Sequence, residues 1–342
     1  MTDIIETLEK LCALDAPSGA EGEVRDFILN EIKDFAQCET DNMGNIIAFK
    51  KGKTAPSKKL MLDAHMDEVG FIVTGIDGSG LIKFSTLGGI DTNVIVGRRV
   101  RFLKDKTLGV VGVKPVHLCS QDEKKNQVKK DDLYIDIGAL NREEALQKVK
   151  PGDFAVFEGG LESFGDGKLC GKAVDDRAGC AILIDMIKSE IQYDMYFTFT
   201  VQEEVGLRGA KAAAFAIAPD FALVVEATTA ADILGVPEEG RVCTLGGGAA
   251  VSFMDRSTVY DREMYELCFE IAKEKGIKCQ PKAAVAGGNN SGEIHRSRAG
   301  VRTAAISVPC RYLHSAVCVS SRDDIMSAAA LVRAVAEKIL SL

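Results

Sequence analysis

The chain has 342 residues, and 42 Lys and Arg against 50 Asp and Glu give it a formal net charge of −8. This length suffices for about two domains with a sizeable hydrophobic core. The acidic balance excludes nucleic acid as the main partner, because neutralising phosphates requires clustered Lys and Arg. No run approaches the roughly 18 apolar residues of a spanning helix, and residues 1–14 lack the basic segment of a secretory signal. We therefore expect a cytoplasmic protein with no membrane partner.

The ten cysteines are scattered along the chain and form no CxxC pair. Several of them fall within apolar helix or strand patterns. This distribution favours buried thiols in a reducing compartment over a disulfide framework or a thiolate metal site.

Both ends of the chain alternate helical and strand patterns, as α/β proteins do. Ser18 with Glu21 matches a capping box ahead of an apolar helical stripe. Buried strands are predicted at 59–65, 195–201, 221–225 and 303–308, and helices at 3–14, 177–188, 257–275 and 324–340. We expect 1–68 and 164–342 to form one doubly wound α/β domain.

The middle of the chain has a different pattern. From about Val69 to Gly160, short β-like runs are broken by Gly, and helical periodicity is nearly absent. This pattern is typical of a small antiparallel barrel or sandwich. We assign 69–163 to an inserted β domain, and we expect its Lys-rich stretch 121–132 to be a solvated loop.

Candidate chemical residues fall where the predicted strands end. They are His65 and Asp67 after the first strand, Glu203 and Glu204 after the second, Glu226 after the third, His314 shortly after the fourth, and Asp175 with Asp176 just before a helix. Ligand sites in open α/β sheets lie at the carboxyl ends of strands. The joint placement therefore indicates one site, although each residue alone also has an ordinary structural explanation.

Two histidines with several carboxylates and no thiolate favour Zn²⁺, with Co²⁺ or Mn²⁺ as alternatives. Residues two apart on a strand face the same side, so Asp67 is expected to accept a hydrogen bond from the far nitrogen of His65. Glu203 and Glu204 point in opposite directions on an extended chain. One of them can bind metal while the other acts as a general base.

The chain resembles the tetrahedral aminopeptidase family of di-metal exopeptidases, which includes glutamyl and deblocking aminopeptidases. The resemblance covers essentially the whole chain. It rests on the blocks HMDEVG (65–70), DDRAG (175–179), EEVGLRGA (203–210) and RYLHS (311–315), in that order. It implies a mixed-sheet, di-zinc exopeptidase-like catalytic domain and an inserted, PDZ-like or barrel-shaped oligomerisation domain.

The resemblance also implies the role of each residue. Asp175 would bridge two divalent metal ions, His65 and Glu226 would complete one site, and Glu204 and His314 the other. Glu203 would be the general base for a metal-activated water, Asp67 the partner of His65, and Asp176 a support for Asp175, through an unusual geometry of the peptide bond between the two. The substrates would be peptides with a free N-terminus, and the assembly a homo-oligomer, commonly a dodecamer built from dimers.

Three positions depart from the family pattern. Glu226 stands where many relatives have Asp, Asn290 follows Asn289 where relatives often have Asp, and Ala249 replaces a common proline. The last two changes leave the expected ligands untouched but bear on specificity or rate. Of the other histidines, His117 is expected at a structural position or subunit contact, and His295 in a packed or hydrogen-bonded helix.

Other functions remain as alternatives. A glycoside hydrolase would use paired carboxylates, but it gives His65 and His314 no role, and the chain has no Trp to stack on sugar rings. A non-catalytic metal-binding or scaffold relative is a further alternative, although such a protein would be expected to lose Glu203 first. A deacylase or carboxypeptidase on the same fold is disfavoured by the inserted β domain.

Overall fold

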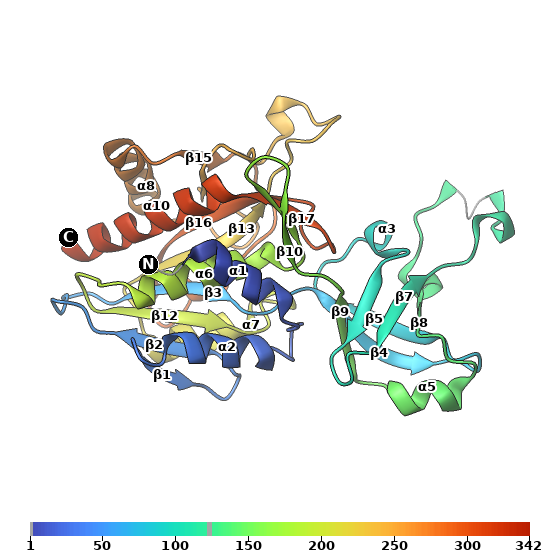
Figure 1. The fold of residues 1–342 in the computed structure, drawn as a ribbon. Coiled ribbons are helices and arrows are strands. Elements are labelled where there is room, and N and C mark those ends of the chain that lie inside the picture. The colour runs from blue at the N-terminus through green and yellow to red at the C-terminus, as the bar shows by residue number, and fades with distance from the viewer. Residues whose placement is uncertain (1–2, 122–124) are drawn as a thin grey trace.

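The computed structural model describes residues 3–121 and 125–342, and Figure 1 shows an α/β body beside a smaller β body. Residues 122–124 of the expected solvated loop lie outside the described residues. No helix within the described ranges is long and apolar enough to cross a membrane. All ten cysteines are free thiols; six of them are buried and four are partly exposed.

One mixed sheet of eleven strands runs through the α/β body, in the order β1-β2-β12-β3-β13-β16-β17-β11-β10, with β14 joining β16 and β15 joining β14. The central strands β12, β3, β13 and β16 are parallel neighbours. The strands are β1 (Gln37–Thr40), β2 (Ile46–Lys50), β3 (Leu60–His65), β10 (Leu161–Phe164), β11 (Lys168–Gly171), β12 (Met195–Thr200), β13 (Phe221–Thr229), β14 (Ala249–Ser252), β15 (Cys279–Lys282), β16 (Arg302–Arg311) and β17 (Cys318–Ser321).

Helices cover both faces of this sheet, which explains why its central strands are apolar throughout. In β3, Leu60, Leu62 and Ala64 pack into the main core, whereas Met61 faces a smaller apolar cluster on the opposite side. Helices α1, α2, α6, α8 and α10 contribute to the main core, and α7 and α9 to the smaller cluster. Their bounds are α1 (Ile4–Ala13), α2 (Gly22–Ile32), α6 (Val174–Lys188), α7 (Arg208–Ile217), α8 (Arg262–Lys275), α9 (Ser291–Ile294) and α10 (Arg322–Ser341).

The β body is a closed, six-stranded antiparallel barrel in the order β4-β5-β8-β7-β6-β9. Phe71 lies in its core, with its ring edge-on to Phe84 and Phe157 at centroid distances of 5.3 and 5.2 Å. The elements are β4 (Gly70–Ile76), β5 (Ile82–Leu87), α3 (Thr92–Ile95), β6 (Arg99–Phe102), β7 (Leu108–Gly112), β8 (Tyr134–Asp136), α5 (Arg142–Lys148) and β9 (Phe154–Phe157), with short 3₁₀ turns at Val116–Leu118 and Lys130–Asp132. The prediction of a small β unit within an α/β fold is confirmed.

The chain enters the barrel after β3 and returns through β10 and β11 (Figure 1). The barrel strands run from Gly70 to Phe157. Strand β10 already belongs to the large sheet, because it pairs with β11. The barrel therefore branches from the end of β3, next to the strand ends where the candidate residues were expected.

The predicted capping box is wrong. The Ser18 hydroxyl donates a hydrogen bond to the carboxylate of Asp67 at 2.6 Å. The Glu21 carboxylate accepts from the backbone N–H groups of Gly19 and Gln202 at 2.7 and 3.1 Å. These polar side chains serve contacts between distant segments, and they leave the start of α2 without a side-chain cap.

The helix predicted over 257–275 begins later, at Arg262. Its cap is Asp261, whose side chain accepts a hydrogen bond from the N–H of Met264 at 3.0 Å. Aspartate is a strong helix-capping residue, so the helix starts where this side chain can satisfy a free amide.

Candidate metal centre

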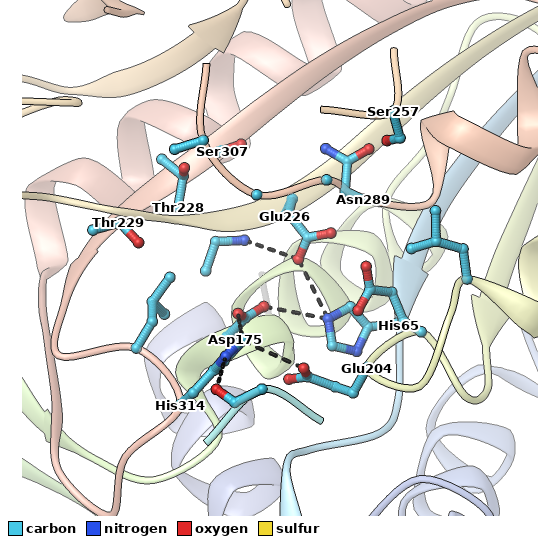
Figure 2. A pocket seen from close by; sticks show the side chains of 18 of the residues that line it. His65, Asp175, Glu204, Glu226, Thr228, Thr229, Ser257, Asn289, Ser307 and His314 are labelled. Carbon is cyan, nitrogen blue, oxygen red and sulfur yellow. Dashed lines mark hydrogen bonds and ion pairs between the residues drawn. The ribbon is translucent and has the colours of Figure 1, made fainter. Parts of the chain in front are cut away.

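The candidate residues meet at one edge of the large sheet. They are His65 at the end of β3, Glu203 and Glu204 after β12, Glu226 within β13, His314 after β16, and Asp175 at the start of α6. Because the four strands are parallel neighbours, their carboxyl ends converge, as the sequence predicts. Figure 2 shows these side chains, apart from the unlabelled Glu203, directed toward one another.

Asp175 lies between two histidines, with one carboxylate oxygen toward each (Figure 2). Its Oδ1 is 3.2 Å from Nε2 of His65, and its Oδ2 is 3.6 Å from Nε2 of His314. A second carboxylate accompanies each ring: Glu226 Oε1 is 3.4 Å from His65 Nε2, and Glu204 Oε2 is 3.3 Å from His314 Nε2. The result is two histidine–carboxylate groups that share Asp175.

Backbone carbonyl groups orient both imidazole rings. Nδ1 of His65 lies 3.0 Å from the carbonyl oxygen of Asp67, and Nδ1 of His314 lies 2.9 Å from that of Gly89. A carbonyl oxygen only accepts hydrogen bonds, so in each neutral ring Nδ1 carries the proton and the Nε2 lone pair faces the cluster. Metal-bound histidines are commonly oriented in this way.

Asp67 contacts His65 differently from the expectation. Its carbonyl oxygen is the nearer acceptor, while its carboxylate Oδ1 lies 3.4 Å from Nδ1 of His65. The carboxylate instead accepts the backbone N–H groups of Glu203 and Glu204 at 3.0 and 3.1 Å, together with the hydroxyl of Ser18. Asp67 thus holds the backbone of both glutamates as well as the ring of His65.

Asp176 is buried and follows Asp175 through a cis peptide bond. Its Oδ2 accepts a hydrogen bond from the N–H of His65 at 3.2 Å, and its Oδ1 accepts one from the N–H of Gly179 at 3.0 Å. A Cβ at position 179 would lie 2.5 Å from Oδ2 of Asp176, which only glycine avoids. Asp176 therefore connects the start of α6 to the end of β3.

Burial of this cluster strongly perturbs its acids. Burial raises the pKa of Glu203 well above its ordinary value, and raises the pKa of Glu204 and of Glu226 to about 8. Burial acts in the same direction on Asp175, but its two histidine partners bring its pKa well below the ordinary value. Burial would lower the pKa of His314, but Asp175 and Glu204 raise it to about 10. The site holds desolvated carboxyl groups whose charged form a divalent cation would stabilise.

The donor set fits a borderline divalent metal. Ligand atoms of His65, Asp175 and Glu204 lie within 4.8 Å of one another, and so do those of His65, Asp176 and Glu226. Imidazole and carboxylate suit Zn²⁺, Co²⁺ or Mn²⁺. No cysteine is found among the described residues that line the cavity around the cluster.

That cavity has a volume of about 510 Å³. Its wall includes residues that sequence reasoning did not single out: Gly89, Asp91 and Val94 from the barrel segment, and Thr228, Ser257, Lys282 and Ser307 from the α/β body. They come from separate elements and share no motif, so only the fold brings them together. His117 is exposed on the barrel and His295 bonds within its own turn, and neither belongs to the described lining.

The positions at which the chain departs from the family pattern differ in whether they reach the cavity. Asn289 lines the cavity, but Asn290 is buried behind it and donates to Asp63 and Thr200, at 2.8 Å in each case. Ala249 is fully buried in β14. Neither Asn290 nor Ala249 is among the described residues that line the cavity.

Comparison with protein families gives a match to the model described as M42 glutamyl aminopeptidase, over residues 44–331. The chain is 42% identical to a putative aminopeptidase of Acetivibrio thermocellus, with 96% of this chain and 97% of that protein covered. It is 31% identical to lysyl aminopeptidase of Pyrococcus furiosus, with 98% and 97% covered. It is 30% identical to glutamyl aminopeptidase of Lactococcus lactis subsp. cremoris, with 97% and 96% covered.

Several solved structures are similar to this chain in both fold and sequence. A TET aminopeptidase from a marine sediment archaeon, Thaumarchaeota archaeon SCGC AB-539-E09, has a TM-score of 0.93 at 34% identity, covering 98% of this chain and 96% of that chain. The Pyrococcus horikoshii TET1 peptidase, described as assembling into a tetrahedron or a large octahedral shell, has a TM-score of 0.84 at 35% identity, covering 98% and 99%. A protein of Thermotoga maritima named endoglucanase has a TM-score of 0.80 at 34% identity, covering 97% of each chain.

Proposed function

The chain belongs to the M42 glutamyl aminopeptidase family, and from that premise we propose that it removes N-terminal residues from peptides at a centre of two divalent metal ions. In this proposal Asp175 is shared by the two ions. His65 and Glu226 complete one site, and Glu204 and His314 complete the other. The observation that carries the proposal is the opposite orientation of the two Asp175 oxygens, one toward each histidine.

Bound divalent ions would polarise the scissile carbonyl and lower the pKa of a coordinated water. The raised pKa values of Glu204 and Glu226, which burial causes, support the placement of cations beside these acids. We favour Zn²⁺, and the same oxygen and imidazole donors would accept Co²⁺ or Mn²⁺.

Glu203 is the proposed general base. It lines the cavity beside the metal ligands, and Asp67 holds its backbone N–H at 3.0 Å. Its pKa is raised by burial, which suits a carboxylate that must accept a proton and release it again near neutral pH. In the proposed reaction it takes a proton from the attacking water and delivers it to the departing amide nitrogen.

The charge of the cavity supports cleavage at the N-terminus. Asp175, Glu203, Glu204 and Glu226 line it together, so a protonated α-amino group would be attracted there. An internal peptide bond carries no such cation, which supports an exopeptidase.

We further propose that 69–163 acts as an oligomerisation domain, with dimers assembling into a dodecamer. Exposed apolar side chains in β7 and the following 3₁₀ turn support this role: Leu108 and Val110 are each 45% exposed, Val116 73% and Leu118 60%. The tetrahedral assembly of the P. horikoshii relative supports the same expectation. A cytoplasmic location is also part of the proposal, supported by the ten free thiols.

The test is a panel of aminoacyl-p-nitroanilides, assayed with chelator-treated protein and after addition of Zn²⁺, Co²⁺ or Mn²⁺. We expect activity only with added metal. A Glu203→Gln variant should lose about 10²- to 10⁴-fold in kcat while binding the same amount of metal. Absence of peptidase activity with every metal, or hydrolysis of a β-glucan instead, would overturn the proposal. Full activity of Glu203→Gln would overturn the assignment of the base.

A further inference from the structure

The loop that carries Ser18 and Glu21 caps no helix, and it lies instead against the strand ends of the metal centre. The Ser18 hydroxyl donates to Asp67, in the segment after β3, at 2.6 Å. The Glu21 carboxylate accepts the N–H of Gln202, in the segment after β12, at 3.1 Å. The mechanism proposed above gives Glu21 no role, although Gln202 directly precedes the proposed base.

The segment that leads from β12 to the proposed base is held along its main chain. Its four consecutive N–H groups, at 201–204, all donate to buried side chains. The bonds are Val201 to Asn45 at 2.9 Å, Gln202 to Glu21 at 3.1 Å, Glu203 to Asp67 at 3.0 Å, and Glu204 to Asp67 at 3.1 Å. The carbonyl groups at 201, 202 and 203 accept N–H groups from residues 206–209. The backbone of Glu203 is therefore fixed from both sides.

Gln202 has the least favourable backbone conformation in this segment. Its φ of 57° lies in the left-handed region, which a residue with a side chain adopts only where its surroundings hold it there. Glu21, whose side chain is 7% exposed, supplies the acceptor for the N–H of Gln202. The same oxygen, Oε1, also accepts the N–H of Gly19 at 2.7 Å, and this second bond fixes the carboxylate in its own loop.

The conformation of Gln202 decides where the next two side chains lie. A rotation of its backbone would move Glu203 and Glu204 together, relative to His65 on the neighbouring strand. Glu203 lines the cavity as the proposed base, and proton transfer requires it within hydrogen-bond reach of the attacking water. A displacement of about 1 Å at a reacting group can cost about 100-fold in rate.

We propose that Glu21 is a positioning residue for the general base, which it holds in place by accepting the N–H of Gln202. In this role Glu21 acts through the backbone and exchanges no proton with the substrate. The inference rests on the proposed aminopeptidase function and adds a residue to its machinery.

The test compares variants of Glu21 in the metal-loaded protein, on the p-nitroanilide that the wild type cleaves fastest. Methionine accepts neither N–H group, whereas the amide oxygen of glutamine can accept both. Glu21→Met should lower kcat by about 10- to 100-fold, with KM and bound metal near the wild-type values. Glu21→Gln should restore kcat, because the acceptor is needed and the charge is not. Glu21→Asp keeps the charge but is one methylene group shorter, so it should also lower kcat.

A second measurement does not depend on peptidase activity. Hydrogen exchange, followed by mass spectrometry of fragments within 201–209, reports how firmly these amides are held. The amides at 202–204 should exchange faster in Glu21→Met than in the wild type or in Glu21→Gln.

The matched control is Asp324→Leu. Asp324 is also a buried carboxylate that accepts two backbone N–H groups, those of Gly246 and Gly248, at 2.7 Å in each case. It is not among the described residues that line the cavity. Asp324→Leu should lower the urea-unfolding midpoint, as Glu21→Met does, but it should leave both kcat and the exchange at 202–204 unchanged.

Three results would overturn the proposal. They are a wild-type kcat in Glu21→Met or Glu21→Asp, equal losses of kcat in Glu21→Met and Asp324→Leu, and a loss in Glu21→Gln as large as that in Glu21→Met. Failure of the proposed function is a distinct outcome, because the wild type itself would then cleave no substrate with any metal.

Discussion

Replacement of Asp67 by Asn tests whether this residue positions the backbone of Glu203 and Glu204. Its Oδ1 accepts the N–H of Glu203 and lies near Nδ1 of His65, and its Oδ2 accepts the N–H of Glu204 and the hydroxyl of Ser18. An asparagine keeps one oxygen and replaces the other with an NH₂ group. Whichever way the amide turns, the NH₂ faces a backbone N–H that needs an acceptor.

The expected size of the effect follows from this geometry. Asp67 is fully buried, so the displaced N–H loses its acceptor away from water, which costs about 1–3 kcal/mol of stability. The same change shifts the segment that carries Glu203 and Glu204. Substitution of groups that support metal ligands commonly lowers metal affinity or activity by about 10- to 100-fold. We expect Asp67→Asn to lose that much kcat/KM.

The measurements are aminoacyl-p-nitroanilide kinetics at saturating metal, metal titration, and urea unfolding. Ser18→Ala is the matched control, because it removes one donor to Asp67 and leaves both glutamate N–H groups bonded. It should cost about 0.5–1.5 kcal/mol, with a much smaller kinetic effect. Wild-type kinetics and metal affinity in Asp67→Asn would refute the reasoning, as would equal kinetic losses in the two variants.

Three further predictions concern stability and metal. Lys172→Met should destabilise the protein by about 3–5 kcal/mol, because the buried ammonium lies 2.8 and 2.9 Å from the carboxylate oxygens of Glu68. Urea unfolding measures this change, and an unchanged denaturation midpoint would contradict the prediction. Burial would raise the pKa of Asp15, but Arg101, Lys172 and Lys106 lower it to about 2. The stabilisation that Asp15 contributes is therefore complete above the unfolded pKa of about 3.9 and is lost as pH falls toward 2. Asp15→Asn should therefore flatten the acid side of the melting-temperature profile, and an equally steep fall would argue against this pairing. Chelation of bound metal should abolish peptidase activity and lower the melting temperature of the protein. Added Zn²⁺ should restore both the activity and the melting temperature. Activity that survives exhaustive chelation would exclude a metal mechanism.

Local pattern predicted much of the site because it lies at strand ends. An apolar run that stops at His65, and another that stops before Glu203 and Glu204, identify two strands with polar residues immediately after them. Parallel pairing then brings those ends together, a general property of α/β sheets. The proposed sharing of Asp175 between two metal ions was implied by the family resemblance alone. Local pattern could not predict it, because nothing in the sequence shows which strand ends a residue at the start of a helix approaches.

The alternation of side chains along a strand predicted that Asp67 neighbours His65, but it did not predict the main contacts of the Asp67 carboxylate. Two residues along the chain, the backbone carbonyl of Asp67 lies nearer to the ring than its carboxylate does. The carboxylate meets N–H groups 136 and 137 positions away, at Glu203 and Glu204. No pattern within a single segment contains that information. The capping box at Ser18 failed for the same reason, since its hydroxyl bonds to Asp67 across 49 positions.

The sequence by itself determined the α/β body, the small β insert, the strand ends that carry the candidate residues, and the family, because each of these is encoded in short-range periodicity or in a contiguous motif. Only the tertiary structure decided what surrounds the cluster: the carbonyl groups that orient His65 and His314, and the amides held by Asp67 and Glu21. These contacts join segments that are far apart in the chain. They exist only after the sheet has closed around them, so no local pattern in the sequence contains them.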